Sequence, residues 1–442
     1  MKKIISLIIV CMIIISGMFI YGKSDKKDLL EDSSGPIMAA VIDGKASTTF
    51  PTTNKYVATV ECTRNGVKQD VGAKATWNGT KWVVSFNDIS AGNVRCNVNF
   101  ETKKPAPNGW YEAGNGTLLA SLRNSNTLKT PITTPGVAVS IAEALLAAAE
   151  DDYGTSYYFR GTVTNNYVEF ANKCWRIVRI GGDGSIKLIL HNDNTAGATN
   201  PCDAANNSAS AAFARYSGTT YTSAFNEKYD DNAYVGFMYG TAGSSDYKST
   251  HANINKSTIL TNIETWYNNN LKKYENVIDN TVWCNDKTNV TDTTYDPWRL
   301  TPNGLGYAEN VTYYGATQRL VSTSNRPGGT GPSLKCNGEL SKITSKIGLI
   351  TADELAYAGY AYNYNISGNT TYLQENATDT YWWSLSPGGF RNGSTGVWSV
   401  NGSSGRFSIY GNVSSGLRPS ISLKSTTNVT GEGTSEKPYV VN

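Results

Sequence analysis

Few residues in this sequence have the types and spacing that catalysis requires. The two histidines, His191 and His251, lie far apart in the chain. The sequence contains no H-E-x-x-H zinc-protease motif, no G-x-S-x-G nucleophile elbow and no G-x-x-x-x-G-K-[ST] phosphate loop. A cysteine–histidine nucleophile pair is formally open, but an isolated histidine is more often hydrogen-bonded than catalytic. We therefore predict that the protein is not an enzyme.

Carboxylates offer a different chemistry, because Ca²⁺ is bound through oxygen ligands. Asp230-Asp231 is an adjacent acidic pair, and Asp296 precedes Pro297-Trp298. Neither position lies in a D-x-D-x-D-G loop, and aspartate is common in turns. We predict turns at both positions and no cofactor, with a structural calcium ion as the alternative.

The strongest binding signal lies near the C-terminus. Residues 389–415 consist mostly of Gly, Ser, Asn, Arg, Tyr, Trp and Phe, with few aliphatic residues. Paratopes use such residues, because rigid aromatic side chains anchor a ligand and small polar ones hydrogen-bond to it. The predicted anchors, of the types enriched at binding hot spots, are Arg391, Trp398, Arg406 and Tyr410. An ordinary edge hairpin with a solvated face explains this composition equally well.

A small all-β domain is predicted over residues 37–103. Asn78-Gly79 is a strong hairpin signal between two strand-like runs. Cys62 and Cys96 each lie in or beside a strand-like segment of this domain. We predict that these two cysteines form a disulfide, with two reduced core cysteines as the alternative.

A linker and a helix are predicted over residues 104–152. Ser140 and Glu143 have capping-box spacing ahead of the apolar run Ala144–Ala149, which indicates a helix there. The main domain is predicted over residues 153–442.

Within the main domain, the sequence indicates one hairpin and two helices. Residues 175–190 read as two strands around a Gly-Asp-Gly turn. Ser257 precedes a run with helical spacing, and Thr351 with Glu354 forms a second capping box. The 27 tyrosines and 10 tryptophans favour strands, so the whole chain is expected to be rich in β-structure.

The N-terminus predicts export. Lys2 and Lys3 precede the uncharged apolar run 4–20, the pattern that the secretion machinery reads. Two interpretations of this segment remain. Residues 1–22 form either a cleaved signal peptide or an uncleaved anchor, which is held in the membrane through residues 4–20. Residues 23–36 are predicted to be a stalk. We expect the rest of the chain to be extracellular.

Charge and cysteine usage fit this location. The net charge is +3 and no basic cluster follows residue 30, so no nucleic-acid partner is predicted. Six cysteines lie outside the apolar run, an even number that suits disulfides in an exported protein. The absence of any C-x-x-C pair argues against a zinc site.

Several segments resemble a family of surface proteins from Gram-positive gut bacteria, which ends in a W-W-x-L-S-P-G…G-L-R-P domain. These segments are Tyr158–Gly161, Trp175–Arg179, Leu349–Glu354, Trp382–Gly388, Gly416–Pro419 and Gly431–Tyr439. The domain is similar to the C-type lectin fold of formylglycine-generating enzymes and of the variable proteins of diversity-generating retroelements. The resemblance therefore implies an α+β, β-rich protein, in which a membrane segment and a small all-β domain precede a C-type-lectin-like domain.

The resemblance also implies a display surface on the last hairpins. The implied binding residues are Arg391, Asn392, Ser394, Thr395, Trp398, Ser399, Asn401, Ser403, Arg406, Ser408, Tyr410, Asn412 and Ser414. The implied framework residues are Trp382, Trp383, Pro387, Arg418 and Pro419. The E-P-N and W-N-D motifs of calcium-dependent lectins are absent from this segment, and so is the close cysteine pair of formylglycine-generating enzymes.

The function expected from these features is ligand recognition. The ligand is expected to be a protein or a glycan on another cell or host surface. The alternatives are a structural envelope protein and, third, an enzyme of the formylglycine-generating type.

Overall fold

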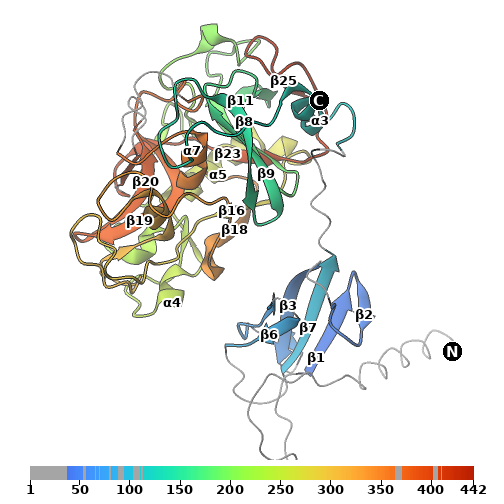
Figure 1. Cartoon of the computed structure of the whole chain (residues 1–442), viewed down its shortest axis with the longest axis vertical. Helices are drawn as coiled ribbons and strands as arrows, with labels where there is room; N and C mark the ends of the chain where they lie inside the picture. Colours follow the sequence, from blue (N-terminus) through green and yellow to red (C-terminus); the bar gives the residue numbers. More distant parts are fainter. Residues whose placement is uncertain are drawn as a thin grey trace, which may run out of the picture. The chain divides into compact units, whose positions relative to one another are not determined.

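The computed structural model (Figure 1) describes most of the chain after residue 36. The described residues are 37–52, 56–64, 66–68, 70–78, 81–87, 94–102, 110, 113–363, 371–401, 407–409 and 411–442. The predicted membrane segment 1–22 and stalk 23–36 lie outside them. Contacts divide the chain into one unit over residues 1–105 and another over residues 106–442.

The predicted fold class needs correction. The described elements are mostly strands, and no helix among them is long and apolar enough to cross a membrane. The predicted α+β class is therefore corrected to a mostly β fold with no membrane-spanning helix among the described residues. Its β-rich character is confirmed.

The first unit is built on a five-stranded sheet. Its strands are β1 (Ile37–Ile42), β2 (Lys45–Ser47), β3 (Tyr56–Arg64), β4 (Val67–Lys68) and β7 (Val94–Thr102). Their order is β2-β1-β7-β3-β4, with β1 and β7 parallel. A separate hairpin joins β5 (Lys74–Trp77) to β6 (Trp82–Ser85), which confirms the Asn78-Gly79 signal.

The core of the first unit lies against β7. Val98 and Phe100 are fully buried, because alternate residues of this strand face the same side. Cys62 on β3 lies directly opposite Cys96 on β7, and the two form a disulfide. The cysteine pair predicted from the sequence is therefore present.

The larger sheet of the second unit has eight strands. They are β8 (Ala144–Asp151), β9 (Gly154–Gly161), β10 (Tyr167–Phe170), β11 (Lys173–Ile180), β12 (Ile186–Asn192), β23 (Ser420–Leu423), β24 (Val429–Thr430) and β25 (Tyr439–Val441). The main path runs β23-β12-β11-β10-β25-β24, and β9 joins β11 to β8. The antiparallel pairing of β11 with β12 confirms the predicted hairpin at residues 175–190.

The smaller sheet of the second unit has six strands. They are β13 (Thr222–Ser223), β17 (Thr312–Tyr313), β19 (Trp382–Arg391), β20 (Ser394–Val400), β21 (Phe407–Ile409) and β22 (Ser415–Gly416). Their order is β13-β22-β19-β20-β21, with β17 paired to β19. Two further pairs are β14 (Met238–Tyr239) with β15 (Asn255–Lys256), and β16 (Thr281–Cys284) with β18 (Lys342–Ser345).

Short helices cover and connect these sheets. They are α3 (Leu118–Ser125), α4 (Tyr247–His251), α5 (Thr258–Asn270), α6 (Gly315–Leu320) and α7 (Ala352–Ala358), with single 3-10 turns at Ala204–Asn206, Asn232–Val235, Lys272–Tyr274 and Glu339–Ser341. Ser257 caps α5, and Thr351 forms a capping box with Glu354 at α7, so both predicted helix starts are confirmed. Helix α7 contacts β9 of one sheet and β19 of the other (Figure 1).

The helix predicted at Ala144–Ala149 is wrong, because this segment is strand β8. The backbone of Ser140 does donate to Glu143 Oε2 at 3.0 Å, as in a capping box. However, the same carboxylate binds Nε of Arg160 at 3.1 Å, and both side chains are fully buried. Strand β8 pairs with β9 along its whole length. Glu143 therefore forms a long-range ion pair with Arg160, and the chain continues into strand β8 of the sheet.

Candidate functional site

The structure spreads the predicted binding residues over several environments. Asn392, Asn412 and Ser414 are exposed, and Arg391, Ser394 and Asn401 are half-buried. Thr395, Trp398 and Ser399 are buried. The side chains of Ser403, Arg406, Ser408 and Tyr410 lie outside the described residues. The predicted framework residues Trp382, Trp383, Pro387, Arg418 and Pro419 are all buried.

Trp398 is not a surface anchor, which corrects the prediction from composition. Its side chain is fully buried, and its ring lies 5.7 Å from that of Tyr362. Strand β20 lies between β19 and β21, and every residue from Thr395 to Val400 is buried. The alternative of an edge hairpin with a solvated face does not describe this strand either, because both of its faces are covered.

An aromatic and cationic cluster lies at the tip of this hairpin instead. The guanidinium of Arg391, the last residue of β19, lies 4.4 Å from the ring centre of Trp298. Nε1 of Trp298 donates to the hydroxyl of Tyr362 at 2.8 Å, and that hydroxyl donates to Oδ1 of Asn325 at 2.8 Å. Trp298, Tyr362 and Arg391 are each half-buried, and we call these three residues the hairpin patch.

Buried and hydrogen-bonded neighbours fix the position of Trp298 in the hairpin patch. The Trp298 ring packs at 5.0 Å from that of Tyr313, which is fully buried. The hydroxyl of Tyr313 donates to Oδ1 of Asp296 at 3.1 Å. Asp296 also accepts from the backbone N–H groups of Leu300 and Thr301, at 2.7 Å each. The carboxylate therefore fixes the turn that carries Trp298.

Both predicted aspartate turns are confirmed. Asp296 accepts backbone hydrogen bonds within its own loop. Asp231 accepts from the N–H of Ala233 at 2.8 Å and caps the 3-10 turn that follows. Within the described ranges, no group of three or more His, Cys, Asp or Glu side chains is placed to hold a metal ion.

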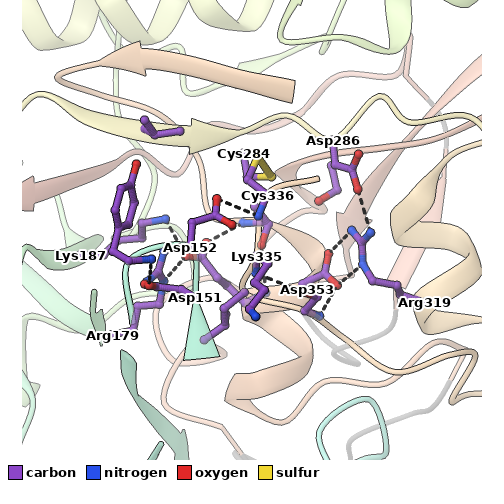
Figure 2. Close-up of a pocket in the computed structure, with 17 residues that line it drawn as sticks. Asp151, Asp152, Arg179, Lys187, Cys284, Asp286, Arg319, Lys335, Cys336 and Asp353 are labelled. Atoms are coloured by element: carbon purple, nitrogen blue, oxygen red, sulfur yellow. Dashed lines mark hydrogen bonds and ion pairs between the residues drawn. A yellow bond between two sulfur atoms is a disulfide. The ribbon is translucent and has the colours of Figure 1, made fainter. Parts of the chain in front are cut away.

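A second candidate site is a pocket lined by ion pairs, which we call the ion-pair pocket (Figure 2). Its interior space is about 40 Å³, which holds about three water molecules at ~10–15 Å³ each. The Cys284–Cys336 disulfide forms part of its wall. Its charged lining consists of Asp151, Asp152, Arg179, Lys187, Asp286, Arg319, Lys335, Asp353 and Glu354.

On one side of this pocket, Glu354 holds two cations. Its Oε1 accepts from Nε of Arg179 at 2.7 Å and from Nζ of Lys187 at 2.6 Å. Arg179 also donates through Nη1 to Oδ2 of Asp151 at 2.8 Å. Burial raises the pKa of Glu354, but Lys187 and Arg179 outweigh that effect and lower it to about 2. Glu354 is therefore ionised at neutral pH.

On the other side, Arg319 of α6 binds two carboxylates. Nε and Nη2 of Arg319 donate to the two oxygens of Asp353 at 2.7 and 2.8 Å, a bidentate pair. Nη1 donates to Oδ2 of Asp286 at 2.7 Å. These bonds join α6, α7 and the segment after β16 around the pocket.

Three of the six segments that carry the family resemblance meet at this pocket. Arg179, Glu354 and Ser386 each come from a different one of them, and all three line it. The hydroxyl of Ser386 accepts from the N–H of Ala352 at 2.9 Å, which ties β19 to the start of α7. The sequence contained these residues in recognisable motifs but gave no sign that they share one site.

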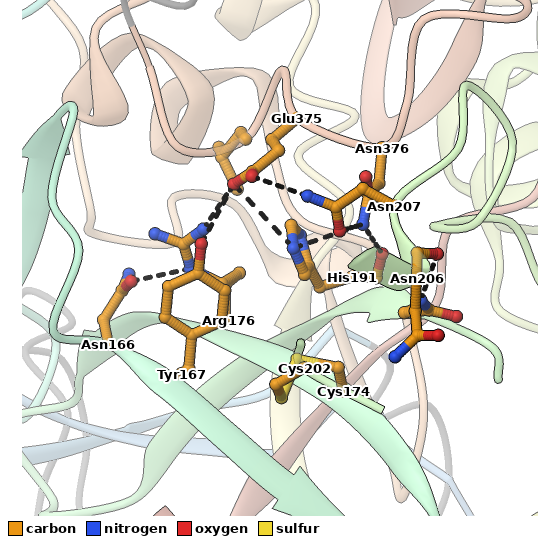
Figure 3. Close-up of polar contacts among 12 residues, drawn as sticks. Asn166, Tyr167, Cys174, Arg176, His191, Cys202, Asn206, Asn207, Glu375 and Asn376 are labelled. Carbon is orange, nitrogen blue, oxygen red and sulfur yellow. Dashed lines mark hydrogen bonds and ion pairs between the residues drawn. A yellow bond between two sulfur atoms is a disulfide. The ribbon is translucent and has the colours of Figure 1, made fainter. Parts of the chain in front are cut away.

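His191 lies in a closed polar network (Figure 3). Its Nε2 is 3.8 Å from Oε2 of Glu375 and 3.3 Å from Nδ2 of Asn376. The same Oε2 accepts from the hydroxyl of Tyr167 at 3.1 Å and from Nη1 of Arg176 at 3.0 Å. Burial lowers the pKa of His191 well below its ordinary 6.5, and Arg176 lowers it further. The ring is therefore neutral and confined to the interior.

His251 is buried beside an unusual lysine. Its Nε2 lies 2.7 Å from the carbonyl oxygen of Gly306, and burial lowers the pKa of His251 to about 3. Lys287 donates from Nζ to the backbone oxygens of His251 at 2.6 Å and Met238 at 3.0 Å, and to Oδ1 of Asn253 at 2.7 Å. All three acceptors are neutral, and burial lowers the pKa of Lys287 to about 7.

This lysine predicts a pH-dependent stability. Because the pKa of Lys287 is about 7 in the folded chain and 10.5 ordinarily, the unfolded chain binds more protons between these values. The penalty for burying the charge is complete below pH 7 and fades as the pH rises to 10.5. Wild-type stability relative to Lys287→Met should thus rise with pH, by up to about 1.4 kcal/mol per pH unit. Urea unfolding of both proteins at pH 7 and pH 9 measures this; an unchanged difference contradicts it.

The cysteines of the second unit are paired as well. Cys174 is bonded to Cys202, and Cys284 to Cys336. With Cys62–Cys96, the structure thus contains three disulfides, which are consistent with an extracellular environment.

Sequence reasoning missed Trp298 and Tyr362 as site residues. Both lie in irregular segments with no periodic pattern, so nothing local placed them beside Arg391. The one available signal was the Asp296-Pro297-Trp298 run, a turn that holds a large aromatic residue on a loop.

Comparisons with known proteins add no relative. No family model, no curated protein and no solved structure matches the chain. The resemblance to the gut-bacterial surface family and to the C-type lectin fold therefore stays a prediction.

Proposed function

We propose that this chain is a recognition protein that works outside the cytoplasm and binds a protein or glycan on another cell through the hairpin patch. The observation that carries the proposal is the Arg391 guanidinium stacked 4.4 Å from the ring centre of Trp298. Tryptophan, tyrosine and arginine are the residue types that dominate binding energy at interfaces. Here one of each shares a partly exposed cluster.

The hydrogen bonds of the patch support the same function. Trp298 is fixed by Tyr362, and Tyr362 by Asn325, so these rings lose little freedom when a ligand binds. Arg391 lies at the tip of the β19–β20 hairpin, beside the exposed Asn392. Rigid aromatic anchors beside adaptable polar groups are typical of binding surfaces.

The cysteine pairing weighs against the third function, an enzyme of the formylglycine-generating type. That chemistry needs reactive thiols, and all six cysteines in the described part of the chain are in disulfides.

The proposal predicts that Arg391→Ala weakens binding to the target by about tenfold or more, because truncating a hot-spot residue costs about 2 kcal/mol. The purified full chain is tested by flow cytometry on intact bacterial and epithelial cells, and on a panel of immobilised oligosaccharides. Trp298→Phe, which keeps a ring but loses the N–H bond to Tyr362, should weaken binding less than Arg391→Ala.

The matched control is Tyr381→Ala. Tyr381 is an exposed aromatic residue that precedes the other end of β19, about 30 Å along the strand at ~3.3 Å per residue. Its removal should leave binding unchanged. Equal binding by wild type and Arg391→Ala contradicts the patch as the site, and no binding by the wild type to any cell or glycan contradicts the recognition function.

A further inference from the structure

The ion-pair pocket contains hydrogen-bond donors that the protein itself does not use. Arg179 donates from Nε and Nη1, but its Nη2 has no partner among the described residues. Lys187 donates from Nζ to Glu354, and its ammonium also lies 4.8 Å from the ring centre of Trp283, which leaves one of its three N–H groups for a ligand. Lys335 is exposed at the pocket, and its ammonium has no partner in the described part of the chain.

The unused donors of Arg179 and Lys187 lie close together. Nε of Arg179 and Nζ of Lys187 are both within 2.7 Å of the same oxygen, Oε1 of Glu354. One carboxylate group can therefore contact both cationic heads. Both side chains are held by Glu354, so they are already ordered for such a contact.

The pocket also offers one unused acceptor near these donors. Oδ2 of Asp152 accepts from the N–H of Cys336 at 3.2 Å and from Nζ of Lys342 at 3.1 Å. Oδ1 of Asp152 has no partner within the described ranges. The two oxygens of each other carboxylate in the lining all accept at least one bond. Asp152 is thus the residue able to receive a ligand cation.

The balance of charge selects the class of ligand. Five acidic and four basic side chains line the pocket, and Lys342 pairs with Asp152 from beside it. The net charge is therefore near zero, so neither a multiply charged anion such as phosphate nor a cation gains from it. A ligand with one negative and one positive group gains at both ends.

We propose that the ion-pair pocket binds a free α-amino acid as its zwitterion. The carboxylate lies against Arg179 and Lys187, and the ammonium against Asp152. An interior of about 40 Å³ suits a small member of the class, such as glycine or alanine. This site is separate in its residues from the hairpin patch, so either assignment can fail without the other.

Equilibrium dialysis of isotope-labelled glycine against the full chain tests the proposal. Glycine should bind with a dissociation constant of about 1 mM or lower. N-acetylglycine lacks the ammonium and glycinamide lacks the carboxylate, so each should compete at least about tenfold more weakly than glycine, the loss of ~1.4 kcal/mol. Equal competition by either analogue overturns the zwitterion assignment, and so does the absence of glycine binding.

The Asp152→Asn variant tests recognition of the ligand's ammonium group separately from recognition of its carboxylate. It removes the acceptor charge from a partly exposed side chain, and its partner Lys342 is also exposed. Glycine binding should weaken about tenfold or more, while N-acetylglycine binding stays unchanged. The matched control is Glu432→Gln, which breaks an exposed pair with Lys437 outside the pocket. The proposal is overturned if Asp152→Asn binds glycine as well as the wild type does. It is also overturned if Glu432→Gln weakens glycine binding as much as Asp152→Asn does.

Discussion

Replacing Glu354 with glutamine is expected to lower the free energy of unfolding by about 3–5 kcal/mol, the usual cost of breaking a buried ion pair. Glu354 is almost fully buried and holds Arg179 and Lys187 on one oxygen. Its second oxygen accepts from the N–H of Thr351 at 2.9 Å, in the capping box of α7. Glutamine keeps the size of the side chain but leaves two buried cations without their shared counter-charge.

The pH dependence of this effect has a definite sign. The pKa of Glu354 is about 2 in the folded chain, below its ordinary 4.5. A lowered pKa of an acid adds stability that is complete above pH 4.5 and is lost as the pH falls toward 2. The gap between wild type and Glu354→Gln should therefore narrow over this range.

The measurement is urea unfolding followed by circular dichroism at pH 7, 4 and 2.5. Glu264→Gln is the matched control, because Glu264 pairs with Lys256 at the surface. Removing an exposed pair costs about 0–1 kcal/mol. If Glu354→Gln is no more destabilising than this control, the ion pairs of the pocket contribute little to stability.

The sequence predicted correctly those elements that local contacts determine. Ser257 caps α5 and Thr351 caps α7, because a capping side chain binds an N–H only three residues away. The hairpin of β5 with β6 follows from the Asn78-Gly79 signal between two strand-like runs, and that of β11 with β12 from two strand-like runs around the Gly182-Asp183-Gly184 turn. Each of these signals lies within a single short stretch of the chain, the longest being residues 175–190.

Prediction failed where distant residues decided the outcome. Ser140 and Glu143 have the spacing of a helix start, yet Arg160 of β9 binds Glu143 and the segment becomes strand β8. A buried charge is costly unless it is paired, so this partner outweighs the local signal. No pattern within residues 140–149 reveals that partner.

Contacts between residues that are distant in sequence also determine the two candidate sites. Arg391 was predicted as an anchor from its type and position, and its guanidinium lies 4.4 Å from the ring centre of Trp298. Its partners Trp298 and Tyr362 come from loops more than 25 residues away in sequence, where periodicity says nothing. In the ion-pair pocket, the sequence motifs named Arg179 and Glu354, but only the packing of α7 between two sheets brings them together.

Trp398→Ala should destabilise the fold by about 3–5 kcal/mol, the cost of deleting a large buried side chain. Composition alone predicts that Trp398 is a binding anchor, and an exposed anchor could be removed with little loss of stability. Its side chain is fully buried in β20, against the ring of Tyr362. Removal leaves a cavity beneath the hairpin patch, so any loss of binding follows from the loss of structure.

Trp298→Ala is the comparison that separates the two roles. Trp298 is half-buried, so its removal should cost less stability than that of Trp398, while binding falls at least as far as in Arg391→Ala. Thermal unfolding and cell binding are measured on both variants, with binding at a temperature well below either transition. If Trp398→Ala unfolds like the wild type, its indole does not belong to the core. If Trp298→Ala loses as much stability as Trp398→Ala and binds normally, the hairpin patch is a structural cluster, because a binding surface must affect binding more than folding.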